Sequence, residues 1–152
     1  MSPIAELLPQ AEPMVLLSGY EPTDDLRSAK AFVDVTPRSP FFELEADGVP
    51  SCVALEYMAQ AMALVVGRLR RERGLQPQIG FVLGSRRLET FGDYFVNGQR
   101  YEVSAVCTYE DESFGSFDCE VRAADGTTVA RATLTAFQPD GEMTPEKLQE
   151  YE

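Results

Sequence analysis

Two polar side chains interrupt an otherwise apolar segment near the middle of the chain. Glu56 and Gln60 lie in CVALEYMAQAMALVV (52–66), where the only other polar group is the hydroxyl of Tyr57. A carboxylate in apolar surroundings is costly unless it is paired, hydrogen-bonded or protonated, and enzymes use such groups for proton transfer. Because residues four apart share a helix face, Gln60 is placed to orient Glu56. Glu56 is therefore a candidate catalytic residue, although a structural acid bonded to a loop amide or to Arg86 has the same pattern.

The 152-residue sequence contains no histidine. A Ser-based or Cys-based catalytic triad needs an imidazole, so this polypeptide cannot form one by itself. A second proton-transfer group must be another carboxylate or come from another chain. Glu43, Glu45 and Asp47 precede the apolar segment, and Asp47 is the nearest of them to it. Solvated charges are the plainer interpretation of all three, and we retain Asp47 as a catalytic candidate.

The chain carries a formal net charge of −12. Such acidity argues against a nucleic-acid partner, because contacts to phosphates need a basic face. Two short basic runs nevertheless stand out, and they comprise Arg68, Arg70, Arg71 and Arg73, then Arg86 and Arg87. The first run closes a predicted helix, where cations offset the helix dipole. Alternatively, the arginines form a docking patch for an anionic partner.

Cysteine spacing and the absence of cofactor motifs limit the remaining chemistry. Cys52, Cys107 and Cys119 show no CxxC spacing, which together with the lack of histidine argues against a zinc site. Cys107 and Cys119 are expected to be reduced core residues. No phosphate-binding glycine loop or dinucleotide fingerprint is present, so we expect no cofactor. The apolar run 58–67 is too short to span a bilayer and no secretory signal precedes it, so we expect a cytoplasmic protein without a membrane partner.

The candidate residues need a long helix, and a sheet to hold it. We predict a helix from Ser51 to about Arg73, with Ser51 as its N-cap and Gly74 at its end. Apolar patterns predict strands at 14–20, 29–35, 79–91, 101–110, 113–123 and 127–137, with turns at 22–25, 97–98 and 125–126. We therefore predict an α+β fold in which an antiparallel sheet wraps one central helix and a second subunit covers the outer side of that helix. The predicted domain spans residues 1–138, and a polar tail follows at 139–152.

Four segments of the sequence match one known group of proteins. They are LLPQAEPMVLLSGYEP (7–22), GVPSCVALEYMAQAMA (48–63), IGFVLGSRRLETF (79–91) and YFVNGQRYEV (94–103). The second is the most specific, because Pro50, Glu56, Ala59 and Gln60 supply a proline turn, a helix carboxylate and an alanine-glutamine pair. On these motifs the chain resembles the hotdog-fold 3-hydroxyacyl-acyl-carrier-protein dehydratases, especially the dehydratase-like proteins of aryl-polyene gene clusters.

The resemblance implies that Glu56 acts as the acid in a site shared by two subunits. The family's histidine, fourteen residues before the helix carboxylate, falls at Phe42 in this sequence. The chain therefore lacks the family's base. In such an enzyme we expect Phe42, Tyr57, Phe81 and Gly84 to line the acyl tunnel, with core packing as the alternative for Tyr57. The partner at the basic runs would be an acyl-carrier protein or a coenzyme A thioester, bound by Arg68, Arg70, Arg71, Arg86 and Arg87.

Three functions remain open at this point. In the first, a different hotdog subunit brings the histidine, and Glu56 completes a 3-hydroxyacyl-thioester dehydratase of fatty-acid or polyene biosynthesis. In the second, a homodimer uses Glu56 to hydrolyse acyl thioesters, which hotdog thioesterases do without histidine. In the third, the chain is not catalytic and binds an acyl carrier or a sister subunit.

Overall fold

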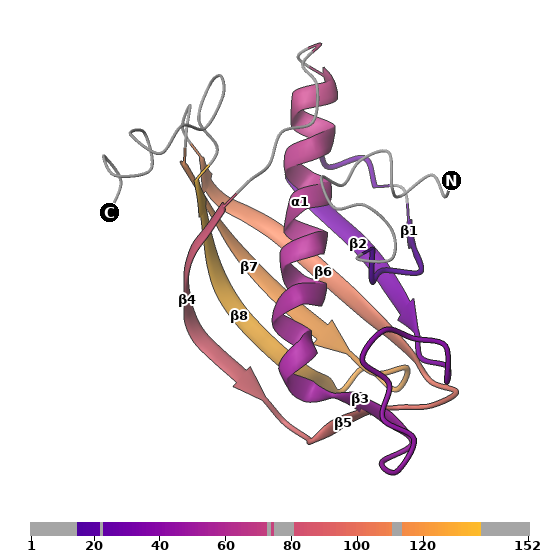
Figure 1. Ribbon diagram of the computed structural model, residues 1–152. Coiled ribbons are helices and arrows are strands. Elements are labelled where there is room, and N and C mark those ends of the chain that lie inside the picture. The colour runs from indigo at the N-terminus through magenta and orange to yellow at the C-terminus, as the bar shows by residue number, and fades with distance from the viewer. Residues whose placement is uncertain (1–14, 22, 73, 75–80, 111–113, 138–152) are drawn as a thin grey trace.

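A computed structural model gives the fold of the chain and describes residues 15–21, 23–72, 74, 81–110 and 114–137. One long helix crosses a curved antiparallel sheet, and a small two-stranded sheet lies near the start of that helix (Figure 1). The predicted α+β arrangement, a sheet wrapped around one central helix, is confirmed within these residues. The polar tail 139–152 lies outside them, so the predicted domain boundary at residue 138 stays a prediction.

The large sheet has six strands in the spatial order β1, β2, β6, β7, β8 and β4. Their bounds are β1 (Gly19–Glu21), β2 (Ser28–Asp34), β4 (Phe81–Thr90), β6 (Arg100–Glu110), β7 (Phe114–Arg122) and β8 (Thr128–Phe137). Neighbouring strands are antiparallel throughout. The small sheet pairs β3 (Gly48–Pro50) with β5 (Tyr94–Val96). The four long strands that follow the helix were predicted, because apolar patterns and clear turn residues mark them, whereas the short strand β5 was not predicted.

Alternation along the strands decides which face of the sheet meets the helix. In β6, Tyr101, Val103 and Ala105 are buried, whereas the residues between them are only partly covered. This is the pattern of a sheet that is apolar on one face. Gly98 and Gly126 lie in the tight turns at φ values of 83° and 88°, which glycine adopts without the strain that a Cβ would bring. The sheet thus presents one continuous apolar face.

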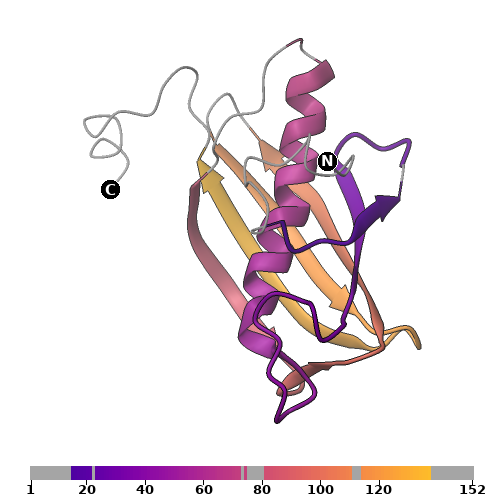
Figure 2. The same ribbon diagram turned by 45° about the vertical axis from the view of Figure 1, so that its right-hand side comes forward.

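Helix α1 (Ala54–Glu72) follows a single 3-10 turn, η1 (Ser51–Val53), and packs on the apolar face of the sheet (Figures 1 and 2). The predicted N-cap at Ser51 is wrong. Pro50 precedes the first turn, no side chain caps it, and the Ser51 N–H donates to the Asp93 carbonyl at 2.8 Å. The Ser51 N–H is thus satisfied by a carbonyl of the segment just before β5.

The end of the helix follows the prediction. Gly74 adopts a left-handed conformation with φ of 73°, and its N–H donates to the Arg71 carbonyl at 3.0 Å. This is the usual use of glycine just beyond a helix.

The segment predicted as a strand at 14–20 is a strand only from Gly19 onward in the described part. Leu16 and Leu17 are buried, yet both lie outside any strand. Their backbone N–H groups donate to the side-chain oxygen of Gln60. Because the Gln60 side chain takes these two donors, they do not pair with a neighbouring strand. Strand β1 therefore begins two residues after Leu17, at Gly19.

Strand β4 forms one edge of the sheet and is interrupted by two bulges. One lies between Val82 and Gly84, and the other between Arg86 and Glu89. Arg87, inside the second bulge, has a φ of 56°, a left-handed conformation that is uncommon for a residue with a side chain. Bulges bend an edge strand and limit its pairing with other strands.

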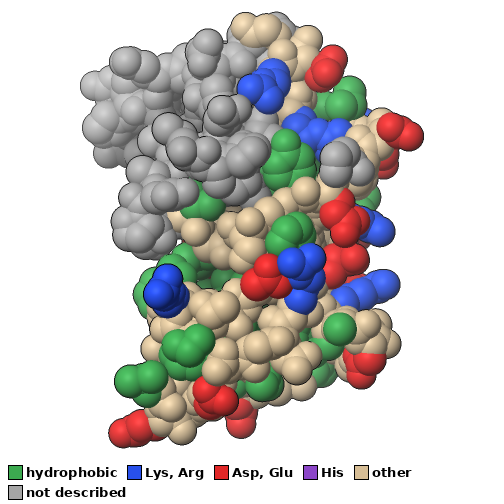
Figure 3. Space-filling view, turned by 90° about the vertical axis from the view of Figure 1, so that its right-hand side faces the viewer, with side chains coloured by type: hydrophobic (Ala, Val, Ile, Leu, Met, Phe, Trp, Pro, Cys, Tyr) green, Lys and Arg blue, Asp and Glu red, His purple; other side chains and the backbone are tan. Residues whose placement is uncertain are grey.

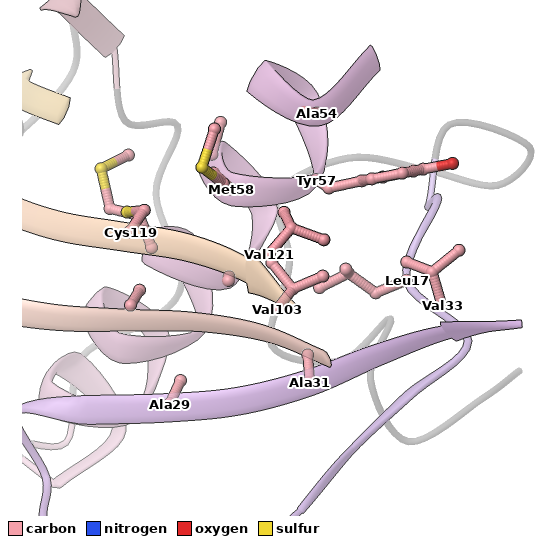
Figure 4. Close-up of a cluster of buried hydrophobic side chains, with 14 of the residues drawn as sticks. Leu17, Ala29, Ala31, Val33, Ala54, Tyr57, Met58, Val103, Cys119 and Val121 are labelled. Atoms are coloured by element: carbon pink, nitrogen blue, oxygen red, sulfur yellow. The ribbon is translucent and has the colours of Figure 1, made fainter. Parts of the chain in front are cut away.

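The hydrophobic core lies between α1 and the sheet (Figure 4). Met58 from the helix and Val103 and Val121 from the sheet have no exposed surface. By length and composition alone, Ser51–Leu69 is apolar enough to cross a membrane, with a mean hydropathy of 1.4. This segment is longer than the apolar run 58–67 considered from the sequence. A core helix needs the same composition, because a sheet covers it in place of lipid.

Candidate active site

Gln60 is a fully buried amide side chain of α1. It has no exposed surface, and no other amide or charged side chain among the described residues is buried. Its Oε1 accepts hydrogen bonds from the backbone N–H groups of Leu16, at 2.8 Å, and Leu17, at 3.4 Å. These bonds join residues more than forty positions apart in the sequence. Gln60 therefore fixes the N-terminal segment against the helix.

The amide nitrogen of Gln60 points at Glu56. Gln60 Nε2 donates to Glu56 Oε1 at 3.1 Å, one helical turn away. The orientation of the amide is decided by its other end, because two N–H donors can face only its oxygen. The predicted pairing of Gln60 with Glu56 is thus present in the structure, and it reaches beyond the pair to the backbone of Leu16.

Glu56 is half-buried in the single chain. It lies on a stripe of α1 with Leu55, Ala59, Ala63 and Val66, and all of these except Ala59 keep partial exposure. The stripe follows the spacing of one helix face. In the single chain the sheet covers only one side of the helix, and the predicted covering of the outer side by a second subunit stays a prediction. The uncovered side carries the carboxylate.

Asp47 lies in the loop before β3 and is exposed. Its carboxylate accepts a hydrogen bond from Asn97 Nδ2 at 3.0 Å, and its carbonyl accepts one from the Asn97 N–H at 3.0 Å. Asp47 also has a φ of 53°. These contacts tie the loop to the turn after β5, and none of them links Asp47 with Glu56. A catalytic role for Asp47 remains a prediction without a supporting contact.

The four predicted tunnel residues lie at different places in the described structure, and their tunnel role stays a prediction. Phe42 is half-buried at the edge of the core, Gly84 is exposed in the β4 bulge, and Tyr57 is buried. Phe81 starts β4, and its side chain lies outside the description. Of these residues, only Tyr57 lines the described cavity, which has a volume of about 270 Å³.

The predicted docking arginines divide into two groups. Arg68 is a structural clamp, because its guanidinium donates to the Thr23 carbonyl at 2.8 Å, to Thr23 Oγ1 at 3.1 Å and to the Ser28 carbonyl at 3.0 Å. Exposed arginines of the set are Arg71, Arg86 and Arg87, whereas the side chain of Arg70 lies outside the description. On the face that carries β1 and β2, acidic and basic side chains are interspersed (Figure 3).

The cysteines are poor candidates for nucleophiles. Cys107 and Cys119 are buried and free, as predicted, and Cys52 is exposed. Burial raises the pKa of Cys107, and burial with the nearby Asp118 raises the pKa of Cys119 to about 12. A raised pKa disfavours the thiolate that nucleophilic attack requires. In the described ranges, no three histidine, cysteine or acidic side chains are grouped to hold a metal ion.

The sequence did not predict the residues that contact Gln60 or that line the cavity beside Tyr57. Leu16 and Leu17 were assigned to a strand, and no signal marked them as partners of Gln60. Arg38 and Ser39, which line the cavity beside Tyr57, lie in a proline-containing loop that no motif singled out. Such contacts between distant segments leave no periodic trace in a single sequence.

Comparisons with known proteins place this geometry in context. A family model described as ApeP-like, ApeP dehydratase, matches residues 2–149. The solved dehydratase heterocomplex ApeI:P from Xenorhabdus doucetiae is similar, with a TM-score of 0.84 and 28% sequence identity over 99% of this chain and 97% of that chain. No curated protein sequence matches the chain.

Two more distant structures share the fold. The PaaI protein of the E. coli phenylacetic acid degradation operon has a TM-score of 0.61 at 13% identity, covering 79% of this chain and 82% of its own. A hypothetical thioesterase from Streptococcus pneumoniae, solved with coenzyme A, has a TM-score of 0.63 at 16% identity, covering 82% and 91%. At such identities these two likenesses concern the fold alone.

Proposed function

Because this chain belongs to the ApeP-like family of dehydratases, we propose that it is the histidine-free subunit of a two-chain 3-hydroxyacyl-thioester dehydratase. Glu56 is the acid of a composite site, and a second hotdog subunit supplies the base. The observation that carries the proposal is the fixed connection from the Leu16 backbone through buried Gln60 to the half-exposed carboxylate of Glu56. The similar ApeI:P structure is a heterocomplex, which supports an assembly of two different chains.

The reaction needs two proton transfers. A base removes the proton from the carbon next to the thioester carbonyl, and an acid protonates the departing hydroxyl, so that a C–H and a C–O bond break and water leaves. Gln60 prepares Glu56 for the second transfer. Because Gln60 Nε2 donates to Oε1, a protonated Glu56 carries its proton on Oε2, and that oxygen gives the proton to the hydroxyl.

The surroundings of Glu56 suit a site at a subunit boundary. Leu55, Ala63 and Val66 leave a partly exposed apolar stripe beside the carboxylate. A subunit packed on this stripe excludes water from Glu56, which strengthens its electrostatic interactions with a substrate. The same subunit brings a histidine within reach, which this chain cannot provide from any position.

The substrate is an acyl group on phosphopantetheine, and we place the docking of an acidic acyl-carrier protein on the exposed arginines of β4. Arg86 and Arg87 are exposed, whereas Arg68 is occupied in holding α1 to the turn before β2. Reversing both charges (Arg86→Glu with Arg87→Glu) is expected to weaken carrier binding and reduce its dependence on salt. The matched control reverses Arg122, an exposed arginine of β7. If reversing Arg122 weakened carrier binding as much as reversing Arg86 and Arg87, the arginines of β4 would not be the docking site.

The test of the function is a product analysis with the chain alone and with a histidine-bearing hotdog partner. A 3-hydroxyacyl thioester of pantetheine or of a carrier protein is supplied, and enoyl thioester and free thiol are followed together. The proposal predicts enoyl product from the mixture and neither product from the chain alone. Free thiol would identify a thioesterase. Enoyl product from the chain alone would show that carboxylates suffice, and failure of a folded mixture to turn over would leave a binding role.

A further inference from the structure

A cavity of about 270 Å³ lies beside Tyr57, between the segment before β1, the end of β2 and the loop that follows it. Val15, Leu16, Leu17 and Val33 give it apolar walls. Glu56 does not line it, so the cavity is not the space in front of the proposed catalytic acid. With about 30 Å³ for each molecule, it has room for roughly nine waters, or for a small organic molecule of similar size.

The inner end of the cavity holds an unsatisfied polar group. Tyr57 is only 2% exposed, and its hydroxyl makes no hydrogen bond with any described residue. Its ring leaves α1 on the side of Leu17 and Val33, with the hydroxyl oxygen at the far end (Figure 4). A buried hydroxyl without a partner costs free energy, so native structures rarely leave one unexplained. A water or a ligand oxygen that accepts a hydrogen bond from Tyr57 would remove that cost.

The loop side of the cavity carries one cation with no partner among the described residues. Arg38 is exposed and forms no ion pair there. The nearby carboxylate of Asp34 is already neutralised, because Arg100 binds both of its oxygens, at 2.6 and 2.9 Å. Arg38 is thus the unpaired charge at this site, and it favours an anion.

The walls are held in place, which indicates a preformed site. Leu16 and Leu17 are fixed by their bonds to Gln60, and Ser18 Oγ accepts a hydrogen bond from the Asp34 N–H at 2.9 Å. On the loop side, Ser39 Oγ accepts a hydrogen bond from the Thr36 N–H at 2.9 Å. Mostly apolar walls with a few fixed polar groups are typical of small-molecule sites.

We propose that this cavity binds a small apolar carboxylic acid whose other end carries an oxygen. The carboxylate lies at Arg38, the carbon chain lies between Leu17 and Val33, and the terminal oxygen accepts a hydrogen bond from the Tyr57 hydroxyl. This site is separate from the proposed dehydration, and its test measures binding and not turnover. It therefore stands or falls independently of the role of Glu56.

The probe is 6-hydroxyhexanoate, which is close in size to nine waters, and hexanoate is the same acid without the terminal oxygen. Affinity is measured by calorimetric or NMR titration of the full chain. The hydroxy acid is expected to bind about three- to tenfold more tightly than hexanoate, the worth of one hydrogen bond. Tyr57→Phe, which keeps the ring, should abolish that preference. Arg38→Gln should weaken both acids by roughly two- to fivefold, as expected for an exposed ion pair.

The control variant is Arg122→Gln, which removes an exposed arginine from β7 and should leave both affinities unchanged. Folding of each variant is checked by its thermal unfolding. Arg38 is exposed, so its replacement tests the carboxylate position even if Tyr57→Phe folds poorly. The proposal is overturned if neither acid binds saturably at millimolar concentration, if the hydroxyl brings no gain, or if the preference survives Tyr57→Phe.

Discussion

Gln60 and Tyr57 are both buried on the same helix, less than one turn apart, and differ in what they bind. Gln60 uses both ends of its amide, one on the backbone of Leu16 and Leu17 and the other on Glu56. Tyr57 packs its ring against Phe95, with 5.2 Å between ring centroids, and leaves its hydroxyl without a described partner. Satisfied buried groups fix a structure, whereas a buried group without a protein partner can bind a water or a ligand.

The largest expected effect comes from removing the acid that Gln60 holds. Glu56→Gln keeps an oxygen that can accept the hydrogen bond from Gln60, so the fold should be unchanged. Turnover of the two-chain complex should fall roughly 100- to 10,000-fold, the usual contribution of a general acid or base. Glu72→Gln, an exposed acid at the end of the same helix, is the control and should retain full activity. The measurement is the initial rate of enoyl formation. A small decrease in that rate for Glu56→Gln would show that Glu56 has a structural role.

The next effect is on stability, because Gln60 is the satisfied member of the pair. Gln60→Leu leaves the N–H groups of Leu16 and Leu17 unpaired in a buried place. Each such loss costs about 1–3 kcal/mol, so we expect the unfolding free energy to fall by about 2–4 kcal/mol in denaturant titrations. Gln99→Leu, at an exposed position, is the control. Equal stability of the two variants would show that the Gln60 bonds contribute nothing.

A smaller effect follows from the Tyr57 hydroxyl. Burial, with a contribution from Tyr101, raises its pKa from the usual 10 to about 12. Below pH 10 the hydroxyl is protonated in the folded and unfolded chains, and its contribution to stability is complete. As the pH rises to 12 the unfolded chain ionises first, so about 2–3 kcal/mol is lost.

The comparison variant is Tyr57→Phe, which should lose less stability than the wild type between pH 10 and 12. Tyr109→Phe changes an exposed tyrosine, 54% exposed, and should behave like the wild type. The pKa of Cys119 is also raised to about 12, so every variant still loses some stability as the pH rises. Identical pH profiles for the Tyr57 variant and the wild type would mean that the hydroxyl is not buried as described.

The sequence predicted the elements better than the contacts. The helix and the four long strands after it follow local patterns of apolar residues and turn residues, which a single sequence displays directly. The late start of β1 could not be predicted in this way, because it depends on Gln60 taking the N–H groups of Leu16 and Leu17. That competition exists only once the helix is packed.

The same limit applies to the candidate site. The spacing of Glu56 and Gln60 predicted their pairing, since helix geometry alone brings them together. The burial of Glu56 depends on what covers the outer side of the helix, because the sheet of a single chain covers only one side and leaves Glu56 half-buried. The contacts of Arg68 and the position of Arg38 beside the cavity could not be predicted for another reason. Each depends on a loop whose position only the folded chain defines.

The central claim is that Glu56 works in a site shared with a second chain. The most direct measurement is a competition in which the Glu56→Gln chain progressively replaces the wild-type chain, at constant total concentration, in a mixture with the histidine-bearing partner. A shared site predicts that enoyl formation falls in proportion to the fraction of variant chain, because each variant occupies a partner without completing its site. Turnover that stays constant as the variant replaces the wild type would contradict the claim.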